Sequence, residues 1–86
     1  MRKPQFSKVF KKQYKRLPNN LQKKFLKQLK YLLENPNHPS LRSKKMQGRE
    51  VYEGRVDYHY RFTFQIDKEE IWLLNIGAHD AGLGKK

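Results

Sequence analysis

The sequence contains no cysteine and few acidic residues, with 8 Asp and Glu against 20 Lys and Arg. The lack of cysteine excludes both disulfide bonds and thiolate metal sites. The three histidines, His38, His59 and His79, show no paired spacing that would put two metal ligands on one helical face. We therefore predict that the protein uses no metal and no cofactor.

Long apolar runs are also absent from the sequence. No stretch approaches the roughly 18 apolar residues of a membrane-spanning helix. Residues 1–5 carry charge but have no apolar segment behind them, so nothing in the sequence indicates export. We expect a cytoplasmic protein that does not act at a membrane.

Positive charge is what the chain has in abundance. Its formal net charge is +12 over 86 residues, and a charge of this size in a small protein indicates a polyanionic partner. Nucleic acid, an anionic membrane and an acidic protein all satisfy that condition, so charge alone does not choose among them. The length supports one domain, residues 1–86, with a single core.

The N-terminal half predicts two amphipathic helices. After a brief edge strand at residues 4–7, apolar residues recur at helical spacing until Pro18. A second helix is predicted over residues 19–34, with Asn19 or Asn20 as its N-cap. Because the connection between the two helices is short, we expect a helical hairpin whose two apolar stripes face the same sheet.

The C-terminal half predicts three strands after a loop at residues 35–48. The first strand covers residues 50–57, and the third, at residues 71–77, is apolar on both sides, which favours an interior position in the sheet. The second strand separates its faces, with Tyr60, Phe62, Phe64 and Ile66 on one side and His59, Arg61, Thr63 and Gln65 on the other. We expect the apolar set to face the helices and the polar set to stay reachable.

Polar side chains gather on that second face. Pairing the first two strands through a turn near Tyr58 brings Arg55, Asp57, His59 and Arg61 close together. His79, just after the third strand, reaches the same end of the sheet.

These residue types suit metal-free cleavage of RNA. In that reaction the ribose 2′-hydroxyl attacks the adjacent phosphate, so protons must move and negative charge must be stabilised. Arg55 and Arg61 suit the phosphate charge, because a guanidinium binds phosphate through two hydrogen bonds. His79, with Glu53 or Asp57, suits the proton transfers. A simpler interpretation of Arg61 is an ion pair with Asp57 or Glu53 across the two strands.

Several short motifs follow one another along the chain. In order they are Leu17-Pro18, Asn35-Pro36, Leu41-Arg42 to Lys45 with Gly48, Val51-Tyr52-Glu53-Gly54-Arg55-Val56-Asp57, Tyr60-Arg61-Phe62, and Leu74-Asn75-Ile76-Gly77-Ala78-His79-Asp80. Together they resemble the RelE/ParE superfamily of toxins from type II toxin–antitoxin systems, over nearly the whole chain. The resemblance implies an α+β fold, an N-terminal helical hairpin packed on one face of a small, mainly antiparallel four-stranded sheet. It also implies an endoribonuclease that cuts messenger RNA in the ribosomal A site.

The resemblance also implies roles for individual residues. Arg61 matches a phosphate-binding arginine, Arg55 another basic active-site position, and His79 a position that holds a catalytic histidine in some members. Glu53 and Asp57 stand where the founding type has basic residues, and the C-terminal tail has no tyrosine, so the chain is nearer the histidine-bearing branch. We predict that RNA or the ribosome is contacted by Arg42, Lys44, Lys45, Arg49 and His59.

The implied partners are a cognate antitoxin, messenger RNA and the ribosome, with operator DNA reached only through the antitoxin. We expect the antitoxin to cover Arg61 and His79. Two other functions remain open at this point: a ParE-like inhibitor of DNA gyrase without nuclease activity, and a basic RNA-binding domain without catalysis.

Overall fold

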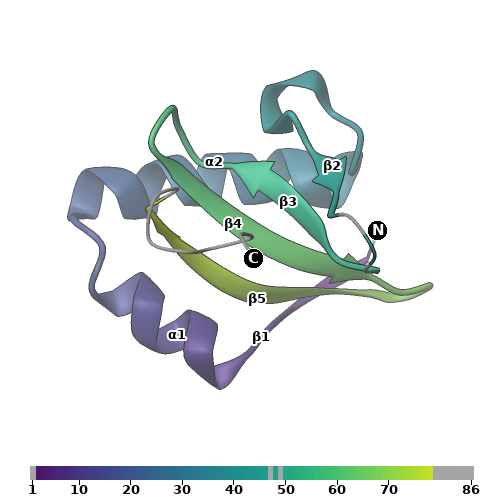
Figure 1. Ribbon diagram of the computed structural model, residues 1–86, viewed down its shortest axis with the longest axis horizontal. Helices are drawn as coiled ribbons and strands as arrows, with labels where there is room; N and C mark the ends of the chain where they lie inside the picture. The colour runs from purple at the N-terminus through teal and green to yellow at the C-terminus, as the bar shows by residue number, and fades with distance from the viewer. Residues whose placement is uncertain (1, 47, 49, 79–86) are drawn as a thin grey trace.

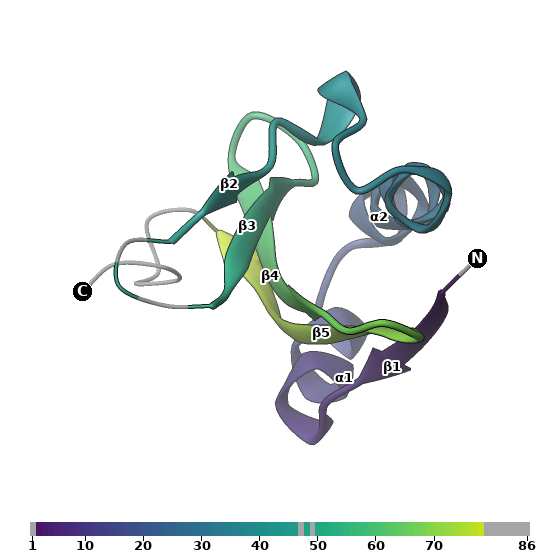
Figure 2. The same ribbon diagram turned by 90° about the vertical axis from the view of Figure 1, so that its right-hand side faces the viewer.

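The computed structural model describes residues 2–46, 48 and 50–78, so Arg49 and His79 lie outside the described residues. Five strands form one sheet in the order β1-β5-β4-β3-β2, and two helices pack on one of its faces (Figures 1 and 2). Along the chain the elements are β1 (Lys3–Phe6), α1 (Lys8–Lys15), α2 (Asn19–Glu34), the 3-10 helix η1 (Pro39–Leu41), β2 (Lys44–Lys45), β3 (Tyr52–Arg55), β4 (Tyr60–Ile66) and β5 (Glu70–Ala78). Within the described residues, no helix is long and apolar enough to cross a membrane.

The predicted α+β architecture is confirmed, with one strand more than expected. The additional strand is β2, which pairs antiparallel with β3 inside a segment predicted as loop. The first of the three predicted strands is shorter than expected, since β3 ends at Arg55. His59 does not belong to a strand, because β4 begins at Tyr60. All neighbouring strands run antiparallel except β1 and β5, which are parallel.

The N-terminal strand β1 lies at the edge of the sheet, as predicted. The amide groups of Lys3 and Ser7 donate to the carbonyls of Glu69 and Leu73, at 2.9 and 3.0 Å. Alternation along the strand then turns Pro4, which has no N–H, toward the open edge, where it is tolerated. Ser7 also starts α1, since its hydroxyl accepts from the Phe10 amide at 2.9 Å.

The start of α2 differs from the prediction. Its N-cap is Pro18 rather than Asn19 or Asn20, and no side chain bonds to this end of the helix. The Pro18 carbonyl accepts from the amides of Leu21 and Gln22, both at 3.0 Å. Pro18 holds an extended conformation (φ −57°, ψ 152°) that leads directly into the first turn. The predicted extent of α2, residues 19–34, is confirmed.

A bulge between β4 and β5 sets which side chains of β5 face the helices. Phe64 pairs with Leu73 and Thr63 pairs with Asn75, so the intervening Leu74 has no pairing partner on β4. As a result Leu73 and Ile76 are both buried in the core, although strict alternation would place them on opposite faces. The predicted interior position of this strand is confirmed, because it lies between β1 and β4.

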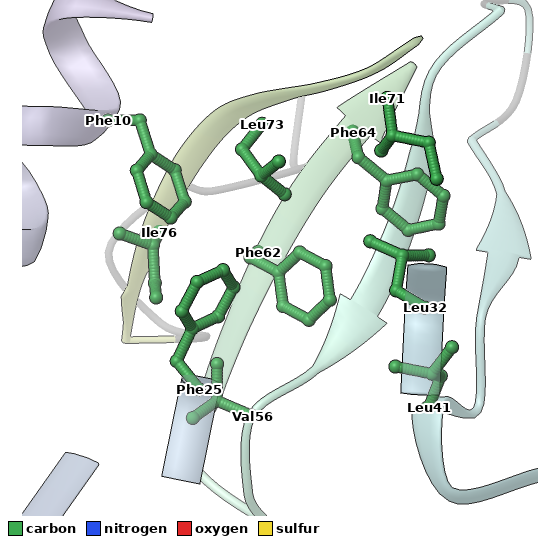
Figure 3. Close-up of a cluster of buried hydrophobic side chains, with 10 residues drawn as sticks. All are labelled: Phe10, Phe25, Leu32, Leu41, Val56, Phe62, Phe64, Ile71, Leu73 and Ile76. Atoms are coloured by element: carbon green, nitrogen blue, oxygen red, sulfur yellow. The ribbon is translucent and has the colours of Figure 1, made fainter. Parts of the chain in front are cut away.

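The core lies between the helices and the sheet (Figure 3). Its centre is Phe62 of β4, which is fully buried and meets the Phe25 ring of α2 edge to face, with 5.3 Å between ring centroids. Its buried members are Phe10, Phe25, Leu32, Leu41, Val56, Phe62, Phe64, Ile71, Leu73 and Ile76. Since both helices contribute to this core, both pack on the same face of the sheet.

Candidate functional site

The face of the sheet turned away from α1 and α2, which we call the outer face, carries two arginines side by side. Arg55 of β3 lies directly opposite Arg61 of β4 in the antiparallel register. Both alternate with residues of the core side, Gly54 and Phe62, and therefore project from the outer face. Like charges placed opposite each other destabilise a strand pair. An anion bound between the two guanidinium groups would relieve that repulsion.

Arg61 braces the turn between β3 and β4. Its Nη1 donates to the carbonyls of Asp57 and Tyr58, each at 2.8 Å, and to that of Tyr60 at 3.3 Å. Among the described residues, no carboxylate forms an ion pair with Arg61, so the simple cross-strand ion pair is not present. Because these bonds all involve Nη1, Nε and Nη2 take no part in holding the turn. The guanidinium is thus fixed in place, and its Nε and Nη2 have no hydrogen-bond partner within the part of the chain that the structure describes.

The backbone of Arg55 is held from the helical side of the sheet. Its carbonyl accepts from the amide of Gln28 on α2 at 2.7 Å. Its Nε is buried and has no hydrogen-bond partner among the described residues. A buried donor without an acceptor is costly, so Arg55 carries an uncompensated polar group at this position.

Gln28 is a buried polar residue that joins three elements. Its side-chain nitrogen donates to the carbonyls of Ser40 and Arg55 at 3.0 and 2.7 Å, and its oxygen accepts from the Ser40 hydroxyl at 3.0 Å. Gln28 is only 7% exposed, and both the nitrogen and the oxygen of its side-chain amide are hydrogen-bonded. This network links α2, η1 and the end of β3. It holds the backbone of Arg55, whose side chain projects from the outer face.

Replacing Gln28 with Met is expected to lower the free energy of unfolding by about 2 kcal/mol, because the part-buried bonds to two carbonyls are lost while the volume is nearly kept. Urea unfolding measures the change. The control is Gln65→Met on β4, an exposed position, which should change stability by less than about 0.5 kcal/mol. Equal stability of the two variants would show that the network contributes nothing.

Asp57, predicted on the outer face, instead turns toward the helices. Its carboxylate accepts from the amides of His59 and Tyr60 at 2.9 and 3.0 Å, and Lys24 of α2 lies 3.5 Å away. Burial pushes the pKa of Asp57 upward, but the two amide bonds and the Lys24 charge outweigh it and lower the pKa below its usual value. A carboxylate held ionised in this way is suited to shaping the turn, not to exchanging protons near neutral pH.

The lowered pKa of Asp57 predicts how stability depends on pH. A folded-state pKa below the unfolded one stabilises the protein above the ordinary value of about 3.9, and this contribution is lost as the pH falls through the lowered value. Asp57→Asn keeps an acceptor for the two amides but removes the charge. We expect it to cost on the order of 1 kcal/mol at pH 7 and little near pH 2 in urea unfolding. An equal loss at both pH values would contradict the role of the charge.

Two further predicted residues, Glu53 and His59, lie in different places. Glu53 lies on the outer face opposite Thr63 and next to Lys44 of β2, but at 8% exposure it is buried and less reachable than predicted. His59 is exposed in the turn, with its ring edge to face with Tyr58. The burial of Glu53 depends on residues of the neighbouring strands. The order of residues along the sequence does not show these contacts.

The predicted basic loop is more ordered than the sequence indicated. Arg42 follows η1 with a left-handed backbone (φ 47°) and an exposed side chain. Lys44 and Lys45 of β2 are both exposed. Lys45 forms an ion pair with Glu50 at 3.2 Å. Among the residues that the structure describes, no three His, Asp or Glu side chains gather in a way that would hold a metal ion.

Two residues that were not singled out belong to the site. Lys24 holds Asp57 against α2, and Asn75 of β5 donates to the Thr63 hydroxyl at 3.4 Å on the outer face. Thr63 was placed correctly on the polar face but is only 3% exposed. The signal for Asn75 is a lone amide in an apolar strand, Ile71-Trp72-Leu73-Leu74-Asn75-Ile76.

Comparison with known proteins identifies the architecture. No protein-family model and no curated protein matches the chain. Among solved structures, archaeal RelE in its complex with RelB from Pyrococcus horikoshii superimposes with a TM-score of 0.78 at 19% identity, over 93% of this chain and 97% of that one. The fold is that of the RelE and YoeB toxins.

Two further structures carry the same RelE-like fold. The E. coli RelBE toxin–antitoxin complex matches with a TM-score of 0.76 at 20% identity, covering 93% of this chain and 99% of that one. The YoeB–YefM complex from Staphylococcus aureus matches with a TM-score of 0.78 at 19% identity, covering 92% and 98%. At such identities the likeness establishes the RelE-like fold, so roles must be argued from side chains.

Proposed function

We propose that the protein is the toxin of a type II toxin–antitoxin system and that it cleaves messenger RNA on the ribosome without a metal ion. The observation that carries this proposal is the pair Arg55 and Arg61, opposite each other on the outer face of a RelE-like fold. Two guanidinium groups at one place, of which Arg61 is held by backbone carbonyls, are suited to a phosphodiester that gains negative charge during reaction.

The proposed reaction makes use of this placement. The ribose 2′-oxygen forms a bond to the adjacent phosphorus, and the bond from phosphorus to the 5′-oxygen breaks, leaving a cyclic phosphate and a 5′-hydroxyl. Arg55, through its guanidinium charge, and Arg61, through the nitrogens not used in the turn, stabilise the charge on the phosphorane oxygens. Because Arg61 is already held by backbone carbonyls, little reorganisation is needed when the phosphate binds.

Two protons must move in the same reaction. One leaves the 2′-hydroxyl and one joins the 5′-oxygen. We assign the proton transfers to His79, which lies outside the described residues, and to Glu53 on the outer face. Asp57 has a positioning role, since its lowered pKa keeps it ionised.

The partners in this proposal are an antitoxin, the ribosome and its message. The antitoxin would inhibit by covering the outer face at Arg61, and it would also connect the protein to operator DNA. Contacts with ribosomal RNA are assigned to the exposed basic residues near the sheet edge and turn, which are Arg42, Lys44, Lys45 and His59, together with Arg49 outside the described residues. The reaction would take place in the cytoplasm.

A purified translation reaction tests the proposal. Primer extension on a defined message is run with and without ribosomes, with antitoxin-free protein. We expect new 5′ ends within A-site codons only when ribosomes are present. If folded protein cuts nothing, the nuclease proposal fails; loss of DNA supercoiling on induction would then indicate gyrase, and salt-sensitive RNA binding without toxicity would indicate a non-catalytic RNA-binding domain.

A further inference from the structure

The only tryptophan of the chain, Trp72, lies on the outer face of the sheet and not in the core. Its neighbours Ile71 and Leu73 are fully buried on the helical side, so alternation along β5 turns the indole to the outer face. Trp72 is half-buried, and among the described residues it belongs neither to the hydrophobic cluster nor to the side chains packed against it. A large aromatic ring that the core does not use is available to a ligand.

The indole of Trp72 is held in one orientation. Its Nε1 donates to Oε1 of Glu70 at 3.2 Å. The other oxygen of the same carboxylate, Oε2, accepts from the side-chain amide of Gln5 at 3.1 Å. Glu70 therefore joins the ring to β1, which lies beside β5 (Figure 1). Because the ring is already fixed, a planar group that stacks on it costs little additional side-chain ordering.

Two amide side chains flank the ring. Gln5 of β1 and Gln65 of β4 are both in register with Trp72, one on each side, and so project from the same face. A carboxamide both donates and accepts hydrogen bonds, and the edges of nucleobases offer both kinds of partner. An aromatic plane bordered by such groups is typical of sites that bind the unpaired bases of single-stranded RNA.

The charges on the outer face separate a place for phosphate from a place for a base. Arg55 and Arg61 lie opposite each other and suit a phosphate. The ring of Trp72 instead lies beside the carboxylate of Glu70, which repels a phosphate but accepts a hydrogen bond from the amino group of a base. A nucleotide chain carries both anionic phosphates and planar bases, and therefore matches both places.

The two places lie within reach of one RNA strand. Gln65, the partner of Trp72, follows Arg61 by four residues on the same face of β4. At a rise of about 3.3 Å per residue, the separation along the strand is about 13 Å. This is a span of a few nucleotides, so a strand with one phosphate between the arginines can place a neighbouring base on the ring.

We propose that Trp72 forms a base-stacking subsite for RNA, in which the indole stacks on a base of the strand whose phosphate lies between Arg55 and Arg61, and Gln5 and Gln65 contact the edge of that base. The inference rests on the proposed function for the identity of the strand as message. Trp72 lies away from the phosphate that reacts, so it determines which RNA is held and takes no part in bond breaking. The stacking itself requires only RNA.

The fluorescence of the parent protein gives the first test, because the signal of a single tryptophan reports on this site directly. The probe is a single-stranded RNA of eight nucleotides with every ribose 2′-O-methylated, so that it cannot be cut through the 2′-oxygen. The matched probe has the same phosphates and sugars but lacks its central four bases. We expect the complete RNA to quench the tryptophan emission and the abasic RNA to leave it nearly unchanged.

Variants of the ring give the second test, with affinity measured by fluorescence anisotropy of a labelled RNA. Trp72→Leu should weaken binding of the complete RNA by about 5- to 100-fold, the usual effect of losing one stacked base, and leave binding of the abasic RNA unchanged. Trp72→Phe keeps a ring and should retain most of the affinity. The control is Tyr31→Leu, which removes a half-buried aromatic on the helical side and should change affinity less than about 2-fold.

Three results would overturn the inference: no quenching by the complete RNA, equal quenching by the abasic RNA, or a folded Trp72→Leu protein that binds the complete RNA as tightly as the parent. If Trp72→Leu does not fold, the parent fluorescence and Trp72→Phe still decide. Cleavage on ribosomes without quenching would remove this subsite and keep the proposed function. Quenching without cleavage would do the opposite, so the two proposals fail separately.

Discussion

Replacing Arg55 with Ala is expected to slow cleavage of ribosome-bound message by about 100- to 1000-fold, the usual effect of removing one preorganised donor from a site of developing charge. The substitution removes the buried Nε, which has no hydrogen-bond partner among the described residues, so the fold should be kept or slightly stabilised. Arg55→Lys keeps the charge but loses the second donor, and should recover part of the rate. Single-turnover cleavage on programmed ribosomes measures all three proteins.

Arg61 should behave differently, because it has two tasks. Arg61→Ala removes the phosphate contact and also the three bonds to turn carbonyls. We therefore expect loss of cleavage together with loss of stability, whereas Arg55→Ala should lose cleavage alone. Gln65→Ala, an exposed residue on the same face, is the control and should cut at the parental rate. A folded Arg55→Ala protein that cuts as fast as the parent would exclude Arg55 from the reaction.

Replacing Gly54 with Ala should give one of the largest stability losses of any small change in this chain. An added Cβ would lie 2.6 Å from Cζ and 2.9 Å from Cε1 of Phe62. Phe62 is fully buried, so its ring cannot move aside without displacing the core around it. We expect a loss of about 1–3 kcal/mol, which for a chain of this length lowers the melting temperature on the order of 10 °C.

Gly77 provides the matched control for this prediction. It lies in the neighbouring region of the same sheet, and an added Cβ there meets nothing within 4 Å. Gly77→Ala should therefore be neutral or slightly stabilising in thermal unfolding. Combining Gly54→Ala with Phe62→Leu should destabilise less than the sum of the single changes, by about 1 kcal/mol or more, because the ring atoms that clash are gone. Strict additivity would show that Phe62 is not the obstacle.

Periodicity was sufficient for the elements whose neighbours lie along the chain. The extent of α2 and the two faces of β4 followed from spacing alone, because each is a repeat written in consecutive residues. The two-residue strand β2 was missed because its pairing with β3 depends on a contact, not on a pattern. The N-cap is Pro18 and not Asn19, because the fixed φ of proline leads into the first turn of α2 without a capping hydrogen bond from a side chain.

The candidate site divides in the same way. Arg55 and Arg61 were predicted together because a tight turn leaves little freedom in how two consecutive strands pair. Asp57 was assigned to the wrong face, since its position depends on Lys24, 33 residues earlier in the chain. The burial of Glu53 also depends on packing of neighbouring side chains.

The sequence by itself determined the two-layer architecture, the apolar core and the concentration of charge in residues 1–33, because these depend on composition and on the repeat of side chains along each element. Only the tertiary structure decided that the bulge turns Ile76 inward, that Asp57 faces α2 and that Arg61 is locked by carbonyls. Those features come from contacts between distant segments, whose energies depend on distance and burial and are not written in any local pattern.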